Sequence, residues 1–157
     1  CWIPWCRGCA ARKRISLAST LQPTPRLSGA GGLVTTLPDM VAMIRALLPG
    51  DNMLLRPEAM DLVTVPRLPA ETAVRFPARG TIEGKVYSAA GAVTLAPSAI
   101  DPPQSKGEVQ WGGVGGTHWW FSPPRNIAGI VMTNRVRAFW HPFSFELKRL
   151  MYDAVLD

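Results

Sequence analysis

The hydrophobic pattern is clearest in residues 107–134, where runs of strand-forming residues are separated by turn residues. Residues 108–111 alternate polar and apolar, which is the period of a half-buried strand. The β-branched and aromatic run 117–121 and the apolar run 127–133 are separated by a Ser-Pro-Pro-Arg-Asn turn at 122–126. Because this connection is short, we expect the last two strands to pair antiparallel.

Two helices are expected before this region. The first begins at Thr36, a suitable N-cap with a proline in the following turn, and ends at the Pro-Gly pair 49–50. The second covers residues 56–63 and also has a proline in its first turn. Four apolar residues of the first helix recur at helical spacing and are expected in the core: Met40, Ile44, Leu47 and Leu48.

A third helix is expected at residues 143–156, where the pattern is amphipathic. Its apolar face should consist of Leu147, Leu150, Met151 and Val155. Lys148, Arg149 and Asp153 lie on its other sides.

Weaker patterns fill the segments between these elements. Residues 64–79 are interrupted by prolines and are expected to be irregular. Residues 82–95 predict one strand or a hairpin that bends at Gly91, and residues 97–106 predict a loop.

Composition is that of one globular domain. A chain of 157 residues can bury about two-thirds of its unfolded surface. No apolar run approaches the roughly 18 residues that a membrane span requires, so we expect a soluble protein, whether cytoplasmic or periplasmic.

Charge is concentrated at the start of the chain. Residues 1–26 carry five basic residues and no acidic one, which leaves 12 basic and 11 acidic residues in the remainder. Basic patches can bind nucleic acid or anionic membranes. Solvated charges on a poorly ordered head are the simpler interpretation, so we do not expect nucleic acid as a partner.

Three cysteines also lie in this head: Cys1, Cys6 and Cys9. Their spacing resembles that of metal and iron–sulfur sites, but such sites need a fourth ligand and no fourth cysteine follows. An odd number of cysteines also argues against a disulfide framework. We therefore expect no metal site. The chain does not begin with methionine, and we interpret it as a fragment.

Two runs carry a family resemblance. WGGVGGTHWWFSPPRNIAGIVMTN at 111–134 resembles the third motif region of the serine β-lactamase and penicillin-binding-protein superfamily, in the form found in its esterase-like members. These members have Trp-Gly-Gly in place of Lys-Thr-Gly, and a Ser-Pro at 122–123 stands where Asp-Pro is usual. SGAGGLVTTLPDMVAMIRALL at 28–48 resembles the family's Gly-Gly-Leu-x-Ser/Thr-Thr segment and the helix that follows it.

The resemblance implies an α+β fold, a partial β-lactamase/transpeptidase-like fold with an antiparallel sheet of three to five strands flanked by helices. Residues 27–157 would form the C-terminal part of a hydrolase domain, and the last helix would pack on the sheet. In the family these strands join a strand from nearer the N-terminus, so we expect an uncovered edge and self-association.

The catalytic motifs of the family are missing. None of the four lysines has a serine three positions before it, and neither tyrosine is followed two positions later by asparagine. Ser-x-x-Lys and Tyr-x-Asn, which supply the nucleophile and the base, are thus absent. We expect the chain to be inactive alone and to act on a small ester or amide, without a cofactor, only when an N-terminal half completes it.

The third motif does supply candidate site residues. Trp111 occupies the position of the family's lysine, which removes a cation and offers an apolar wall to an acyl or alkyl group. Gly112 and Gly113 would allow substrate close to the strand, and Val114 would supply the oxyanion-hole N–H. The alternative interpretation is a simple strand end with a bulge.

His118 is a candidate general base, but it stands in a strand among aromatic residues and is expected to be packed there. Three functions remain open at this point: the substrate wall of a serine hydrolase, a non-catalytic interaction module with that fold, and a nucleic-acid-binding protein that uses its basic head.

Overall fold

The computed structural model describes most of the chain after residue 34. The described residues are 35–51, 53–69, 71–76, 80–113, 115–135 and 142–156. The chain divides into two units, Cys1–Thr35 and Thr36–Asp157, and all described residues except Thr35 belong to the second. The basic head with its three cysteines lies outside the described residues.

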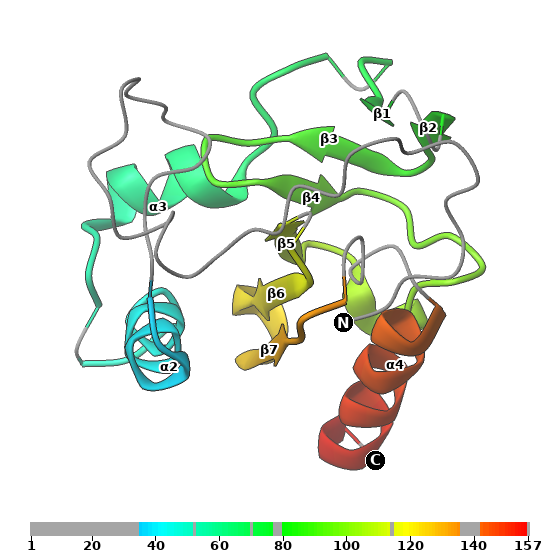
Figure 1. Cartoon of the computed structure of the whole chain (residues 1–157). Coiled ribbons are helices and arrows are strands. Elements are labelled where there is room, and N and C mark those ends of the chain that lie inside the picture. Colours follow the sequence, from blue (N-terminus) through cyan, green and yellow to red (C-terminus); the bar gives the residue numbers. More distant parts are fainter. Residues whose placement is uncertain are drawn as a thin grey trace, which may run out of the picture. The chain divides into compact units, whose positions relative to one another are not determined.

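A five-stranded antiparallel sheet with the order β3-β4-β5-β6-β7 forms the centre of the second unit (Figure 1). Its strands are β3 (Lys85–Tyr87), β4 (Ala92–Thr94), β5 (Val109–Gly113), β6 (Thr117–Ser122) and β7 (Ile127–Met132). Helices accompany this sheet, so the predicted α+β class is confirmed.

A separate two-stranded sheet pairs β1 (Val74–Phe76) with β2 (Gly80–Ile82). The prediction that residues 64–79 are irregular is therefore wrong for β1, where the buried Val74 anchors a strand too short to show a period. The hairpin expected within residues 82–95 is confirmed as the antiparallel pair β3–β4. The expected loop 97–106 contains a 3₁₀ turn, η1 (Pro103–Ser105).

The strands β6 and β7 pair antiparallel over their full length, as the sequence pattern predicts. The chain reverses through the 3₁₀ turn η2 (Pro123–Arg125) and Asn126, which adopts a left-handed conformation with φ of 51°. Asparagine tolerates this conformation better than most residues. On β7, Gly129 lies opposite Trp120, and a Cβ there would come within 2.2 Å of the indole ring. The glycine therefore makes room for the buried tryptophan.

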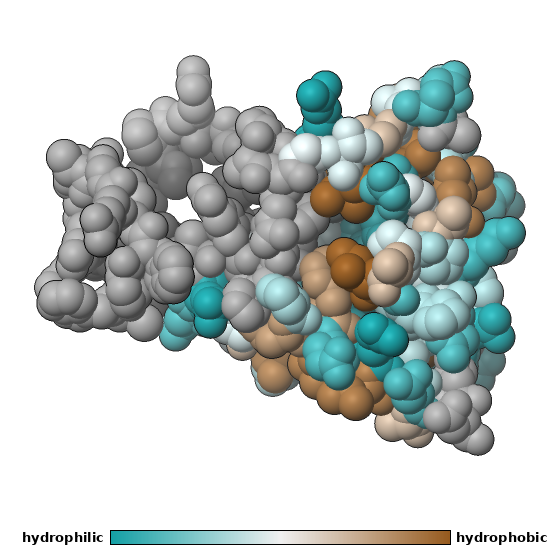
Figure 2. Space-filling model, turned by 90° about the vertical axis from the view of Figure 1, so that its right-hand side faces the viewer, coloured by the Kyte–Doolittle hydropathy of each residue, from teal (hydrophilic) through white to brown (hydrophobic). Residues whose placement is uncertain are grey.

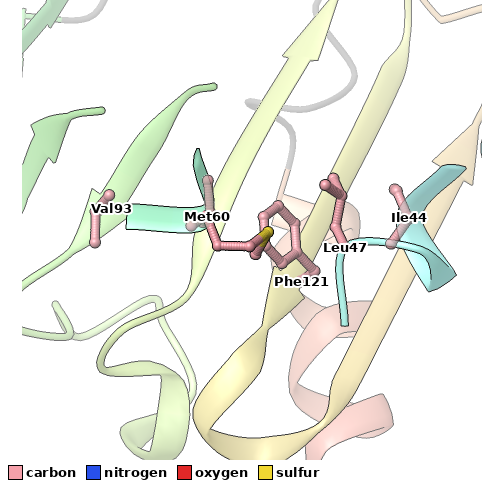
Figure 3. Close-up of a cluster of buried hydrophobic side chains, with 6 residues drawn as sticks. Ile44, Leu47, Met60, Val93 and Phe121 are labelled. Atoms are coloured by element: carbon pink, nitrogen blue, oxygen red, sulfur yellow. The ribbon is translucent and has the colours of Figure 1, made fainter. Parts of the chain in front are cut away.

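Two helices cover one face of the sheet, α2 (Leu37–Arg45) and α3 (Pro57–Thr64) (Figure 1). The side chain of Thr36 caps α2 by accepting from the Asp39 N–H, as expected. The helix ends at Arg45, before the Pro-Gly pair that was expected to end it. The core on this face joins both helices to the sheet and consists of Ile44, Leu47, Met60, Val93, Val109 and Phe121 (Figure 3).

The last helix, α4 (Pro142–Leu156), packs on the opposite face, as the family resemblance implies. Its Tyr152 is fully buried in a second cluster with Trp120, Ile127 and Val131. No helix in the part of the chain that the structure describes is long and apolar enough to cross a membrane.

The predicted apolar face of α4 is wrong for three of its four residues, whereas the fourth, Met151, packs against the second cluster. Leu147, Leu150 and Val155 are 39%, 56% and 62% exposed. The buried face instead carries Ser144, Lys148 and Tyr152, which are each 0% exposed and follow one another at four-residue spacing. The helix turns these polar groups inward because the sheet presents polar partners to them.

Candidate functional site

The candidate site residues Trp111, Gly112 and Gly113 form the end of β5. On one side they pair with β6, opposite Trp119, His118 and Thr117 respectively. On the other side, β4 pairs with β5 only through Ala92↔Gln110 and Val93↔Val109. The β4–β5 pairing therefore ends before Trp111, and the strand edge continues beyond it toward Gly113.

Gly113 has a near neighbour across the sheet. Its N–H donates to Thr117 Oγ1 at 3.0 Å, and a Cβ at position 113 would lie 2.8 Å from the same oxygen. The glycine thus leaves space for this cross-strand hydrogen bond. Val114, the expected oxyanion donor, lies outside the described residues.

The Trp111 side chain is half-buried, and its ring lies 5.4 Å from the ring of Tyr87, at a tilt of 54°. This is an ordinary edge-to-face distance for an aromatic pair. Trp111 also lines a cavity of about 370 Å³, together with residues of β1, β2, the 99–100 turn and α4. Trp111 thus presents part of its indole ring to this cavity, and its role as a wall for substrate remains a prediction.

A buried ion network lies on the α4 side of the same strand. Lys148 Nζ donates to Glu108 Oε1 at 2.8 Å and to Gln110 Oε1 at 3.2 Å, and lies 3.5 Å from Asp101 Oδ1. Tyr152 Oη donates to Glu108 Oε2 at 2.7 Å. Both oxygens of Glu108 accept a hydrogen bond, an arrangement that suits the ionised carboxylate.

The network is electrically balanced. Asp101 also pairs with Lys85, so two cations face two anions. Burial lowers the pKa of Lys85 against the opposing effect of Asp101. Burial would raise the pKa of Asp101, but Lys85 and Lys148 outweigh it and hold that pKa below its ordinary value. Burial raises the pKa of Glu108.

His118 extends this network toward the start of α4. Its Nε2 lies 3.0 Å from Gln110 Oε1, and its Nδ1 lies 2.6 Å from Ser144 Oγ. Lys148 can only donate, so the Gln110 atom that faces it must be the amide oxygen. The same oxygen faces His118 Nε2, and Nε2 must therefore carry a proton to donate to it. Nδ1 is then the acceptor, and the Ser144 hydroxyl donates to it.

The imidazole is a packed, neutral group. Burial, with the nearby charge of Lys148, lowers the pKa of His118 to about 3. Its ring lies 5.0 Å from that of Trp120 and 5.9 Å from that of Phe145, so the predicted packing among aromatic residues is confirmed. With so low a pKa, it is a weak base at neutral pH.

Sequence reasoning missed this network. The amphipathic pattern places Lys148 on a side of the helix other than its apolar face, and the polar–apolar alternation of residues 108–111 predicts a half-buried strand. Glu108 and Gln110 are in fact 0% and 6% exposed. The available signal was a pair of matching polar patterns: two polar residues on one face of a strand, and Ser144, Lys148 and Tyr152 on one face of a helix.

Within the described residues, no group of three or more His, Cys, Asp or Glu side chains could hold a metal ion. The described residues offer the end of a strand, an aromatic side chain beside a cavity, and a buried charge network.

Comparisons with known proteins agree with this architecture. The family model described as Beta-lactamase matches residues 4–143. The fold is similar to that of EstCE1, described as a hydrolase with promiscuous acyltransferase activity, with a TM-score of 0.55 and 24% sequence identity. The alignment covers 76% of this chain and 29% of EstCE1, so the chain spans less than a third of that protein. A comparison with curated proteins gave no match.

Proposed function

The chain belongs to the β-lactamase family, and we propose that it supplies the substrate wall of a serine hydrolase that acts on small esters or amides. The family and the fold place it among hydrolase-related proteins. In our proposal, residues 27–157 form the C-terminal part of the hydrolase domain, and the nucleophile and its base come from outside this chain.

The observation that carries the proposal is the end of β5. Gly112 and Gly113 continue past the last β4–β5 pair, and no described strand pairs with them on the β4 side. The Gly113 N–H and C=O already bond to Thr117 Oγ1 and to the Gly116 N–H, so in our proposal Gly112 offers its backbone groups to an extended or planar ligand. Gly112 and Gly113 place no side chain in the way of such a ligand.

The side chain of Trp111 sets the expected substrate class. A lysine at this position would attract a carboxylate, whereas the indole offers apolar area. We therefore expect a neutral ester with an apolar acyl or alkyl group to be preferred over an anionic β-lactam. The buried network beneath the strand holds Glu108 and Gln110 against α4 and so fixes the strand that carries the wall.

The first test is hydrolysis of p-nitrophenyl butyrate by the chain alone. We expect no rate above that of a denatured control, because loss of a hydrolase nucleophile typically lowers turnover by a factor of about a million. Saturable hydrolysis by the purified chain, lost in a His118→Ala variant, would contradict the proposal.

The second test is a chimera in which residues 36–157 replace the corresponding part of EstCE1. We expect ester hydrolysis to be retained, and Trp111→Ala to raise KM for p-nitrophenyl butyrate more than for p-nitrophenyl acetate, because the shorter acyl group has less apolar area to lose. Circular dichroism of each chimera provides the folding control. A folded chimera in which Trp111→Ala changes neither KM would argue against Trp111 as the wall.

A further inference from the structure

The cavity that Trp111 lines lies between α4 and the sheet and has a volume of about 370 Å³. This is near the lower end of the range of about 300–1,000 Å³ that is typical of small-molecule sites. Its apolar walls come from six different segments of the chain. They include Val74, Ile82, Ala92, Ile100, Trp111 and Phe145.

Three buried polar side chains line the cavity. Lys85, Gln110 and His118 line it and are 4%, 6% and 1% exposed. The oxygen of Gln110 is already used by Lys148 and His118, whereas its NH₂ group has no hydrogen-bond partner among the described residues. Both nitrogens of His118 are occupied. These three side chains therefore offer the cavity hydrogen-bond donors and no free acceptor.

The exposed residues Ala99, Glu146 and Arg149 also line the cavity. Arg149 forms no ion pair with any described residue, although Glu146 lies one turn away on the same helix. Figure 2 views the molecule from the side of α4 and the β1–β2 pair in Figure 1, and apolar and hydrophilic residues lie side by side there. The charged side chains that line the cavity are two cations and one anion.

We propose that this cavity binds a small carboxylic acid as its anion, with the hydrocarbon part against the apolar walls and the carboxylate at the Gln110 NH₂ group and Arg149. A carboxylate has only acceptor atoms, which matches the unused donors of the cavity. Arginine holds a carboxylate through two parallel hydrogen bonds. The proposal does not depend on the proposed hydrolase function, because it concerns binding by this chain alone.

The experiment compares three ligands with the same six-carbon chain: hexanoate, hexan-1-ol and hexylammonium. Each is titrated into the ¹⁵N-labelled full chain at pH 7.4, and binding is followed by amide and indole N–H shifts. We expect hexanoate to bind at least tenfold more tightly than the other two. Equal binding of all three ligands would overturn the proposal. Tightest binding of hexylammonium would also overturn it, because the cavity would then bind a cation through Glu146.

Two variants at exposed positions locate the site. Arg149→Gln should weaken hexanoate at least fivefold and leave hexan-1-ol unchanged. Ala99→Trp should obstruct the cavity and weaken both ligands. Arg125→Gln, which removes an exposed arginine outside the cavity, is the matched control and should change nothing. If Arg125→Gln weakens hexanoate as much as Arg149→Gln does, or if Ala99→Trp has no effect, the cavity is not the binding site.

Discussion

The two faces of the central sheet are held by different forces. On the α2–α3 face, the contacts are apolar and join Ile44 and Met60 to Val109 and Phe121. On the α4 face, apolar contacts are combined with a network of buried charges centred on Lys148. Two neighbouring residues at the start of β5 contribute to both faces. Val109 lies in the apolar core beneath α2 and α3, and Glu108, just before the strand, pairs with Lys148 on the α4 face.

This difference has an energetic meaning. Apolar contacts tolerate partial loss, because a cavity costs free energy in proportion to the volume removed. A buried charge without its partner loses hydration and gains nothing in return. The α4 face should therefore be the more sensitive to a single substitution and to pH, and three changes test this comparison.

The largest effect is expected for Lys148→Ala, which leaves Glu108 without its cation and Asp101 with only Lys85. We expect the free energy of unfolding to fall by about 3–5 kcal/mol, measured by urea denaturation. Leu150→Ala, on the exposed side of the same helix, is the control and should change it by less than about 0.5 kcal/mol. A double variant with Lys148→Ala and Glu108→Gln, which keeps the same truncation at position 148 but removes the unpaired charge, should recover at least half of the loss. Equal losses in the single and double variants would show that packing, not charge, dominates this face.

The second effect concerns the apolar face. Ile44→Ala should lower the free energy of unfolding by about 2–4 kcal/mol, because Ile44 is 1% exposed and its contacts are lost. This loss should be the same at pH 5 and pH 7 in urea titrations, since no charged group belongs to this cluster. A marked pH dependence of the loss would contradict the division into two kinds of face.

The smallest effect is a pH dependence on the α4 face. Burial lowers the pKa of His118 to about 3 in the folded chain, so protons bind the unfolded chain more readily. Stability should then fall as the pH decreases below the ordinary pKa of histidine, by about 2 kcal/mol between pH 7 and pH 5, at about 1.4 kcal/mol per pH unit. The raised pKa of Glu108 has the opposite effect on stability, because the stabilisation that this group contributes at low pH is lost as the pH rises.

The measurement compares wild type with His118→Gln, in which the His118 contribution alone disappears. The variant should be less stable at pH 7 but should lose less stability on acidification. Parallel stability curves for the two proteins would show that His118 does not titrate in this environment.

Sequence reasoning predicted the parts of the fold that local patterns determine. Thr36 marks the start of α2, and the Ser-Pro-Pro-Arg-Asn turn places β6 beside β7 because its geometry is local. The orientation of α4 was predicted wrongly, since hydrophobicity alone favours Leu150 over Lys148 in the core. Only the partners on β5 and the 101 turn reverse that preference, and these lie far away along the chain.

The candidate site was predictable to a similar extent. Trp111–Gly113 were identified by their match to a family triplet, and the structure places them at a strand end beyond the last β4 pair. The cavity beside them could not be predicted, because its walls come from β1, the 99–100 turn and α4. Such a combination depends on tertiary packing and leaves no pattern within any one segment.

The separation of these partners along the chain has a consequence for folding during synthesis. Lys148 lies 40 residues after Glu108, and Tyr152 lies 44 residues after it. Pairings of long sequence separation form late, because the loop between the partners must first be closed. A growing chain therefore carries Glu108 without these partners until α4 has been made. The fifteen residues of α4, Pro142–Leu156, supply the cation and the hydroxyl that Glu108 requires, so the nascent chain cannot become native before they have been made.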